Sequence, residues 1–220
     1  MDADVFVAWF EEAARLVHQD RDRLTRLDAE IGDADHGTNL DRGLTEVCKA
    51  LTGAPPASPA QVLSTAGTTL IRKVGGASGP LYGSVFRQMG KQMSKAAETQ
   101  GTQGTQEARV PVTLAAFAAA FEEGVVAVER LGKAALGDKT MVDALAPASR
   151  ALALAVRDGV DVSEALGQAA RAAAEGAKAT IPMQARKGRA SYLGERSVGH
   201  EDPGAASAAL IMAALATVAG

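Results

Sequence analysis

Alanine is the feature of this sequence that most restricts its fold. The chain of 220 residues contains 47 alanines, which make up nearly half of its hydrophobic fraction of 47%. Alanine is the best helix former and is depleted in strands, and aromatic residues amount to only 4%. We therefore predict close-packed helices and exclude a sandwich or barrel of strands. The length fits one domain, and we expect a single domain over residues 1–220.

Charge and apolar patterning exclude several classes of partner and location. The formal net charge is −3, so no basic surface for nucleic acid is expected. The one cysteine, Cys48, has no internal disulfide partner, which fits a reducing compartment. The N-terminal stretch lacks the order of a signal peptide. The most apolar stretch, residues 205–220, is shorter than the roughly 18 residues that span a membrane. We expect a cytoplasmic protein without a membrane span.

Apolar spacing and breaker clusters divide the chain into about eight helices. Ser58 and Pro59 form a cap followed by proline at the first helical position. Asp161 or Ser163 is expected to cap a later helix. A polar repeat at residues 99–107 is predicted to be a mobile loop. The predicted helices cover residues 4–20, 39–51, 59–74, 80–98, 112–131, 140–157, 161–179 and 203–219.

An acidic cluster follows the first predicted helix. Asp28, Glu30, Asp33 and Asp35 place four carboxylates within eight residues. Without a cation they would repel one another, whereas Mg²⁺ or Ca²⁺ prefers such oxygen ligands. Asp33 and Asp35 are separated by one residue and can face one ion, with Asp28 reaching across the loop. The spacing departs from an EF-hand. From this string alone, a metal site and a solvated acidic loop remain open alternatives.

Two glycine-containing segments precede predicted helices. In the first, residues 75–79, three glycines surround Ala77 and Ser78, so that the backbone and the free N–H groups of a helix start can approach a phosphate. The spacing matches neither Walker A nor G-x-G-x-x-G, and a plain turn is the alternative. In the second, residues 137–145, Asp138 or Thr140 would cap the following helix, or this helix start would line the same site.

A long segment at residues 186–204 places Arg and Lys beside glycines before Asp202-Pro203-Gly204 leads into the last helix. Arginine suits bidentate phosphate contacts, and long loops in compact domains are often functional, although a charged surface loop is the alternative. Together, an acidic loop, a Gly-Ser helix start and an arginine loop are the parts of a metal–nucleotide site. The residues predict an all-helical, Mg-dependent protein that transfers a phosphoryl group or hydrolyses a phosphate.

Four motifs of the chain resemble the L subunit of dihydroxyacetone kinase, the nucleotide-binding subunit. They are DADHGTN, GGASGPLYG, GDKTMVDAL and KGRASYLGERSVGHEDPG, in family order, and with Asp28 they extend to Gly204. The resemblance implies an antiparallel barrel of eight helices, with the nucleotide in loops at one end. One departure is Ala34, where glycine is frequent in the family. A positive φ at this position would strain Ala34.

The resemblance also implies the ligands and their residues. Two Mg²⁺ ions would be held by Asp28, Asp33 and Asp35 against the phosphates of ADP or ATP. Positioning and electrostatics carry most of phosphoryl transfer, so no general acid or base is assigned. The residues expected to contact the nucleotide are His36, Gly37, Thr38, Asn39, Ala77, Ser78, Gly132, Met141, Arg189, Asp202, Pro203 and Gly204.

The resemblance implies a division of the reaction between subunits. Dihydroxyacetone would be held covalently on a histidine of a separate K subunit, and an M subunit of the phosphotransferase system would rephosphorylate ADP in place. A chain of 220 residues has no room for the substrate-binding domain, which favours this branch over the fused, ATP-dependent one. A subunit of an ATP-dependent kinase for another small ketose, and a regulatory module that acts on a transcription regulator, are the alternatives. The oligomeric state stays open, with a homodimer among the options.

Overall fold

The computed structural model describes residues 1–99 and 111–219, and all regular secondary structure in these ranges is helical. Most of the repeat at residues 99–107 lies outside the described residues, so the predicted loop there is not tested. The elements are α1 (Ala3–Ile31), α2 (His36–Gly53), α3 (Pro59–Lys73), α4 (Ser78–Thr99), α5 (Leu114–Gly132), α6 (Val142–Asp158), α7 (Val162–Ala179), the 3₁₀ helix η2 (Arg189–Ser197) and α8 (Pro203–Val218).

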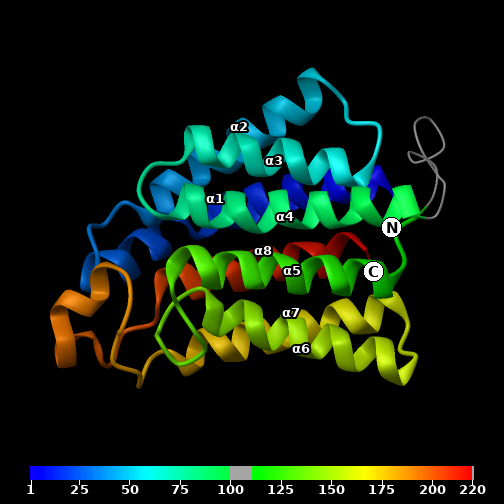
Figure 1. Cartoon of the computed structure of the whole chain (residues 1–220). Helices are drawn as coiled ribbons and strands as arrows, with labels where there is room; N and C mark the ends of the chain where they lie inside the picture. The colour runs from blue at the N-terminus through cyan, green and yellow to red at the C-terminus, as the bar shows by residue number, and fades with distance from the viewer. Residues whose placement is uncertain (100–110, 220) are drawn as a thin grey trace.

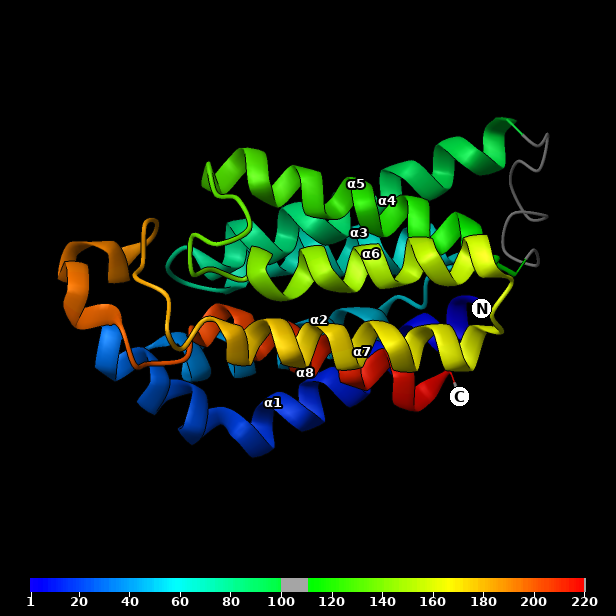
Figure 2. The ribbon, with the colours of Figure 1, turned by 90° about the horizontal axis from the view of Figure 1, so that it is seen from below.

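The α-helices close into a ring. Each packs against the next along the chain, and α8 returns to pack against α1. Figures 1 and 2 show that neighbouring helices run in alternating directions, which confirms the predicted antiparallel barrel. Because the directions alternate, every second connection lies at the same end. The connections after α1, α3, α5 and α7 therefore share one end with η2, and both termini lie at the other (Figure 1).

The core divides between aromatic and alanine packing. Phe6, Trp9, Phe10, Phe86 and Phe117 form a cluster of rings near the start of α1, far from the end that carries η2, with centroids 4.9–6.2 Å apart. Many alanines on the helix faces are fully buried, so small side chains set the close approach of the helices, as the composition predicts. Within the described residues, no helix combines the length and apolarity needed to cross a membrane.

Helix caps follow the sequence at two of three predicted places. The side chains of Ser58 and Asp161 accept backbone N–H groups at the starts of α3 and α7, and Pro59 is the first residue of α3. The prediction for α6 was partly wrong. Asp138 bonds backwards to a loop N–H, and the Thr140 hydroxyl accepts the N–H of Val142 at 3.2 Å.

The first helix is longer than predicted. The sequence pattern predicts an end at residue 20, but α1 continues to Ile31. Leu24 and Ile31 continue the buried stripe, while charged residues of the same stretch pair on the outside, as Arg23 does with Asp20 at 2.9 Å. The dense charge is the solvated face of a helix, and so Asp28 lies on α1 and not in a loop.

The segment at residues 186–204 is also more regular than predicted. Instead of a continuous loop it contains η2, which is bent at Gly194, where φ is +57°. Ala185, directly before this segment, and Ala190 within it are buried beside Ile31 of α1. This small apolar cluster, separate from the main core, holds the segment against the end of the barrel.

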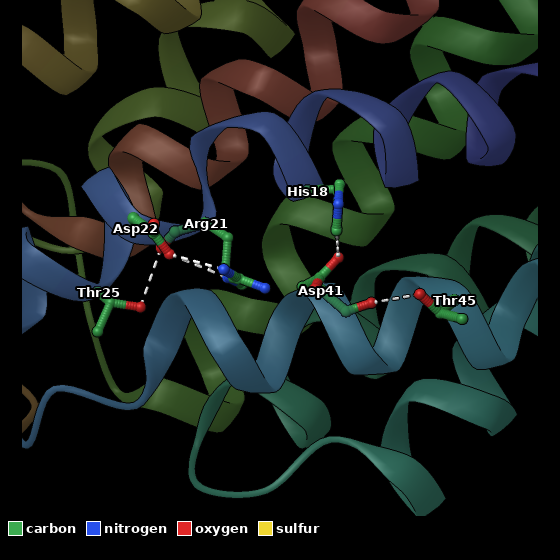
Figure 3. Close-up of polar contacts among 6 residues, drawn as sticks. All are labelled: His18, Arg21, Asp22, Thr25, Asp41 and Thr45. Carbon is green, nitrogen blue, oxygen red and sulfur yellow. Dashed lines mark hydrogen bonds and ion pairs between the residues drawn. The ribbon is translucent and has the colours of Figure 1, made fainter.

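The pairing of α1 with α2 depends on a close backbone approach near the start of α2. A Cβ at Gly37 would lie 2.1 Å from the Arg21 carbonyl oxygen, so only glycine fits there. Figure 3 shows the polar contacts of this region: the Thr25 hydroxyl donates to the Arg21 carbonyl at 2.9 Å, and His18 Nδ1 lies 3.1 Å from Asp41 Oδ1. The crossing places the start of α2 beside the end of α1.

Candidate functional site

Three carboxylates converge where α1 ends and α2 begins. Asp28 lies in the last turn of α1, and Asp33 and Asp35 lie in the short connection to α2. One oxygen from each carboxylate lies within 4.8 Å of the others. The structure thus brings together the three residues that the sequence analysis proposes as metal ligands.

Asp28 is the fixed member of this group. It is buried, and its Oδ2 accepts the backbone N–H groups of Asp35 at 2.9 Å and His36 at 3.1 Å. These bonds fold the connection back over the end of α1. Gly32 permits the fold, because a Cβ there would lie 2.0 Å from Asp28 Oδ1. Ala34 adopts φ of +61° in the same connection, which is the strained conformation considered in the sequence analysis.

The donor set suits a hard divalent cation. Three carboxylates supply only oxygen ligands, which Mg²⁺ and Ca²⁺ prefer over nitrogen or sulfur. A positive charge is supplied by η2, where an Arg189 Nη atom lies 3.1 Å from Asp33 Oδ2. One guanidinium does not neutralise three carboxylates, and the cluster keeps a net negative charge that a divalent cation would offset.

A hydrogen-bonded chain connects the starts of three helices beside the carboxylates. His36, the first residue of α2, has Nδ1 2.9 Å from Ser78 Oγ at the start of α4 and Nε2 2.8 Å from Ser207 Oγ in α8. Ser207 Oγ lies 2.6 Å from the Tyr82 hydroxyl, which also donates to the Gly204 carbonyl at 3.2 Å. Burial lowers the pKa of His36 and raises that of Tyr82. The chain is therefore a neutral network that fixes the Ser78 side chain.

The turn at residues 202–204 closes the other side of the site. The Asp202 carboxylate accepts the Ala205 N–H at 2.7 Å and caps α8, and its own N–H donates to the Thr180 hydroxyl at 2.9 Å. Burial raises the pKa of Asp202 to about 7, with the Ala205 hydrogen bond opposing the shift and the nearby Asp143 adding to it. The Asp202 carboxyl can therefore change its protonation state near neutral pH.

These groups line one cavity at the end of the barrel. Four helices, α2, α4, α6 and α8, begin at this end, and helix N-termini favour anions. An apolar hollow adjoins the cavity and contains Gly132 as well as Ala77 and Met141, which the two share. The residues proposed from the sequence that line the cavity are Asp28, Asp33, Asp35, His36, Ala77, Ser78, Met141, Arg189, Asp202, Pro203 and Gly204.

Three residues expected at the nucleotide lie beside the cavity and not in its lining. Gly37 packs against α1, and Thr38 is exposed. Asn39 accepts a hydrogen bond from Arg42 at 2.9 Å, next to the turn that contains Gly75. They occupy the first turn of α2, whose orientation they help to set.

The structure also shows site residues that the sequence analysis did not assign. Lys139 and Tyr82 lie within the motifs quoted above, but no role was predicted for either residue from the sequence. Ser207 lies in an alanine-rich helix, and no local signal distinguishes it from a helix-surface serine. Tyr82 and Ser207 reach the site because α4 and α8 face each other across the ring, a contact that local spacing does not reveal.

Comparisons with known proteins agree with this arrangement. The DAK2 domain matches residues 30–217. The "PEP-dependent dihydroxyacetone kinase, ADP-binding subunit DhaL" of Escherichia coli is 41% identical over 97% of this chain and 95% of its own length. A subunit of the same description from Listeria innocua, of its kinase 1, is 40% identical over 97% of this chain and 96% of its own length.

A solved structure shares the fold. The dihydroxyacetone kinase of C. freundii, solved in complex with AMP-PNP and Mg²⁺, superposes with a TM-score of 0.70 at 24% identity. The likeness covers 97% of this chain, which spans about a third (34%) of the kinase. Since a domain match covers most of the chain and two relatives match nearly all of it, the chain belongs to the DAK2 domain family.

Proposed function

We propose that this chain is the ADP-binding subunit of a phosphoenolpyruvate-dependent dihydroxyacetone kinase, a phosphotransferase. The observation that carries the proposal is the convergence of Asp28, Asp33 and Asp35 on the cavity that Ser78 and Arg189 also line. Relatives of about 40% identity over nearly the full length carry that description. The chain acts as one domain over residues 1–220.

The carboxylates would hold Mg²⁺, and we propose two ions. Asp28 is held rigidly by two backbone N–H groups, whereas Asp33 and Asp35 extend from the connection and can adjust around the ions. Bound Mg²⁺ supplies positive charge that offsets the phosphate oxygens of ADP or ATP. For a metal-bound nucleotide to enter, the Arg189 guanidinium must exchange its contact with Asp33 for a phosphate oxygen.

The rest of the cavity would hold the nucleotide. Ala77 and Ser78 offer a helix start and a hydroxyl to a phosphate, and the His36 network keeps this hydroxyl in place. The apolar hollow with Gly132 and Met141 suits the base and ribose. The first turn of α2, through Asn39, and the Asp202–Gly204 turn would complete the enclosure.

Phosphoryl transfer in this site would rely on position and charge. Arg189, which pairs with Asp33 and is exposed, would stabilise the negative charge that develops as the phosphoryl group leaves. The substrate would come from outside this chain: dihydroxyacetone on a K subunit, and phosphoryl groups from an M subunit of the phosphotransferase system. We further propose a cytoplasmic location, a homodimer as the free form, and contact with a transcription regulator.

The proposal is tested by reconstitution with the K and M partners. With phosphoenolpyruvate as donor and only catalytic amounts of ADP, the parent protein should form dihydroxyacetone phosphate for many turnovers per ADP. Native mass spectrometry of the isolated chain should show retained ADP and Mg²⁺. If the three proteins together move no phosphoryl group, the proposed activity is wrong. If transfer instead needs stoichiometric ATP, the chain belongs to an ATP-exchanging kinase.

A further inference from the structure

Lys139 is the one lysine that is buried among the described residues, with 1% of its surface exposed. The ammonium group of a buried lysine is costly unless polar partners surround it. Lys139 also adopts φ of +63°, a conformation that costs a residue with a side chain roughly 1–2 kcal/mol relative to a right-handed one. Interactions of the Lys139 side chain must offset both costs in the folded protein.

The Lys139 ammonium is surrounded by backbone carbonyl oxygens. Its Nζ donates to the carbonyls of Thr180 at 2.7 Å, Met183 at 3.1 Å and His200, and the Ile181 carbonyl oxygen lies 3.5 Å away. A carbonyl oxygen can only accept hydrogen bonds, and an ammonium offers three donors and no acceptor. The arrangement therefore matches the charged lysine, in the way that a ring of carbonyl oxygens matches a bound cation.

These carbonyls flank one segment of the chain on both sides. We define the arginine segment as residues 184–199, which contain η2 and Arg189. Met183 precedes this segment and His200 follows it, so one ammonium binds the backbone at both of its ends. The Gly199 N–H also donates to the Ile181 carbonyl at 2.8 Å. The segment is thus a loop closed at its base, and closure limits how far its tip can move.

The same ammonium lies next to the turn that completes the cavity. Thr180, whose carbonyl accepts from Lys139, uses its hydroxyl to accept the Asp202 N–H. Burial lowers the pKa of Lys139, and the charges of Asp202 and Asp143 oppose this shift. Lys139 therefore connects the base of the arginine segment to the Asp202–Gly204 turn.

We propose that Lys139 is a positioning residue, an internal cation that closes the base of the arginine segment and thereby holds Arg189 and the Asp202–Gly204 turn at the nucleotide site. Lys139 also lines the cavity, but its ammonium donates to backbone carbonyls, so it acts through these two groups. The proposal deepens the function proposed above, and its effect on nucleotide affinity rests on that function. The predicted effect of Lys139 on the arginine segment does not rest on that function.

The first test replaces the charge and keeps the length, with Lys139→Met. Without nucleotide, amide hydrogen exchange in residues 184–199 should become faster by about tenfold or more, since charge-assisted bonds at the base are lost. Exchange in α3 and α4 should not change. Mg²⁺–ADP affinity should fall by a similar factor. Lys133→Met is the matched control, because Lys133 also has positive φ, +49°, but is exposed.

The second test restores the cation. Lys139→Ala removes four heavy atoms, which n-propylammonium can replace. Added n-propylammonium should restore slow exchange and Mg²⁺–ADP affinity in a saturable manner, whereas n-propanol, equal in size but uncharged, should not. If Lys139→Ala does not fold alone, the same two additives are compared during refolding. Recovery of the folded chain with n-propylammonium but not with n-propanol supports the proposal.

Three results would overturn the proposal: unchanged exchange in Lys139→Met, equal rescue by amine and alcohol, or a Lys139→Ala chain that neither additive refolds. If the parent protein binds no Mg²⁺–ADP, the proposed function is wrong, and the exchange measurements alone still decide the role of Lys139.

Discussion

Ala34 carries backbone strain in the connection that positions the carboxylates. Its φ of +61° costs alanine roughly 1–2 kcal/mol, which glycine avoids, while glycine loses about 0.4–1 kcal/mol through the entropy of the unfolded chain. Ala34→Gly should therefore raise the free energy of unfolding by about 0.5–1 kcal/mol, measured by urea denaturation. Ala153→Gly, at an exposed helical position in α6, should lower it by about 1 kcal/mol. A destabilising Ala34→Gly would show that the alanine is not strained.

Asp202 should make stability depend on pH. Its pKa is about 7 in the folded protein against 3.8 for the free side chain, so the folded state binds the proton more tightly. The stabilisation is present below about pH 4 and is lost as pH rises to about 7. We compare the free energies of unfolding of the parent and Asp202→Asn in EDTA. Between about pH 4 and pH 7 the parent should lose up to a few kcal/mol relative to the variant, since each unit of pKa shift corresponds to about 1.4 kcal/mol. Asparagine keeps the cap. Parallel pH profiles for the two proteins would contradict the assignment.

Individual residues were predictable where chemistry and local spacing coincide. The three aspartates and Ser78 are such cases: their local strings offered a ligand site beside a solvated acidic loop or a plain turn, and the structure brings these residues to one cavity. Lys139 and Ser207 are the opposite case. Their partners lie 41 to 61 and 171 residues away in the chain, so that no window of sequence contains the interaction.

At the scale of the helices, starts were easier to predict than ends. Proline and capping side chains mark the starts of α3, α7 and α8, whereas α1 ends at Ile31 without such a signal. Its end is set by the Asp28 carboxylate, which binds the following connection. The boundary is therefore a property of the site, and the dense charge before it concealed a continuing helix.

The crossing of α1 and α2 should not tolerate a side chain at Gly37. A Cβ there would meet the Arg21 carbonyl oxygen at 2.1 Å, and the helices would have to separate. Gly37→Ala should lower the free energy of unfolding by about 3 kcal/mol, the upper range for overpacking. Gly53→Ala is the control on the same helix, because no atom lies within 4 Å of its added Cβ. Equal effects of the two substitutions, measured by thermal or chemical denaturation, would show that the approach at Gly37 is not tight.

At the scale of the whole molecule, the alternating barrel explains why four separated motifs act together. Helices of even number begin at one end, so the acidic, Gly-Ser, 137–141 and arginine segments all meet there (Figure 1). Local patterns predicted the number of helices and the alanine packing. The closure of α8 on α1 is a long-range contact, and only the resemblance to a known family made it predictable.

Arg189 lines the cavity in which we propose that the nucleotide binds. It is exposed and pairs with Asp33 at 3.1 Å, so its positive charge is available to a phosphoryl group in transit. Arg189→Ala should slow transfer by about 10³-fold, the lower range for arginines that stabilise this transition state, and should weaken Mg²⁺–ADP binding much less. Single-turnover transfer and calorimetry separate the two effects. A rate equal to that of the parent, with the K partner present, would exclude this role.

The central claim is that the carboxylates at the end of α1 bind a nucleotide through Mg²⁺, and calorimetric titration with ADP tests it most directly. Asp35→Ala is the informative variant, since the Asp35 side chain makes no capping bond to α2, and Asp22→Ala, on the exposed face of α1, is its control. The parent and Asp22→Ala should bind ADP with Mg²⁺ and lose this binding in EDTA, and Asp35→Ala should not bind in either condition. Binding by Asp35→Ala as tight as that of the parent would contradict the account.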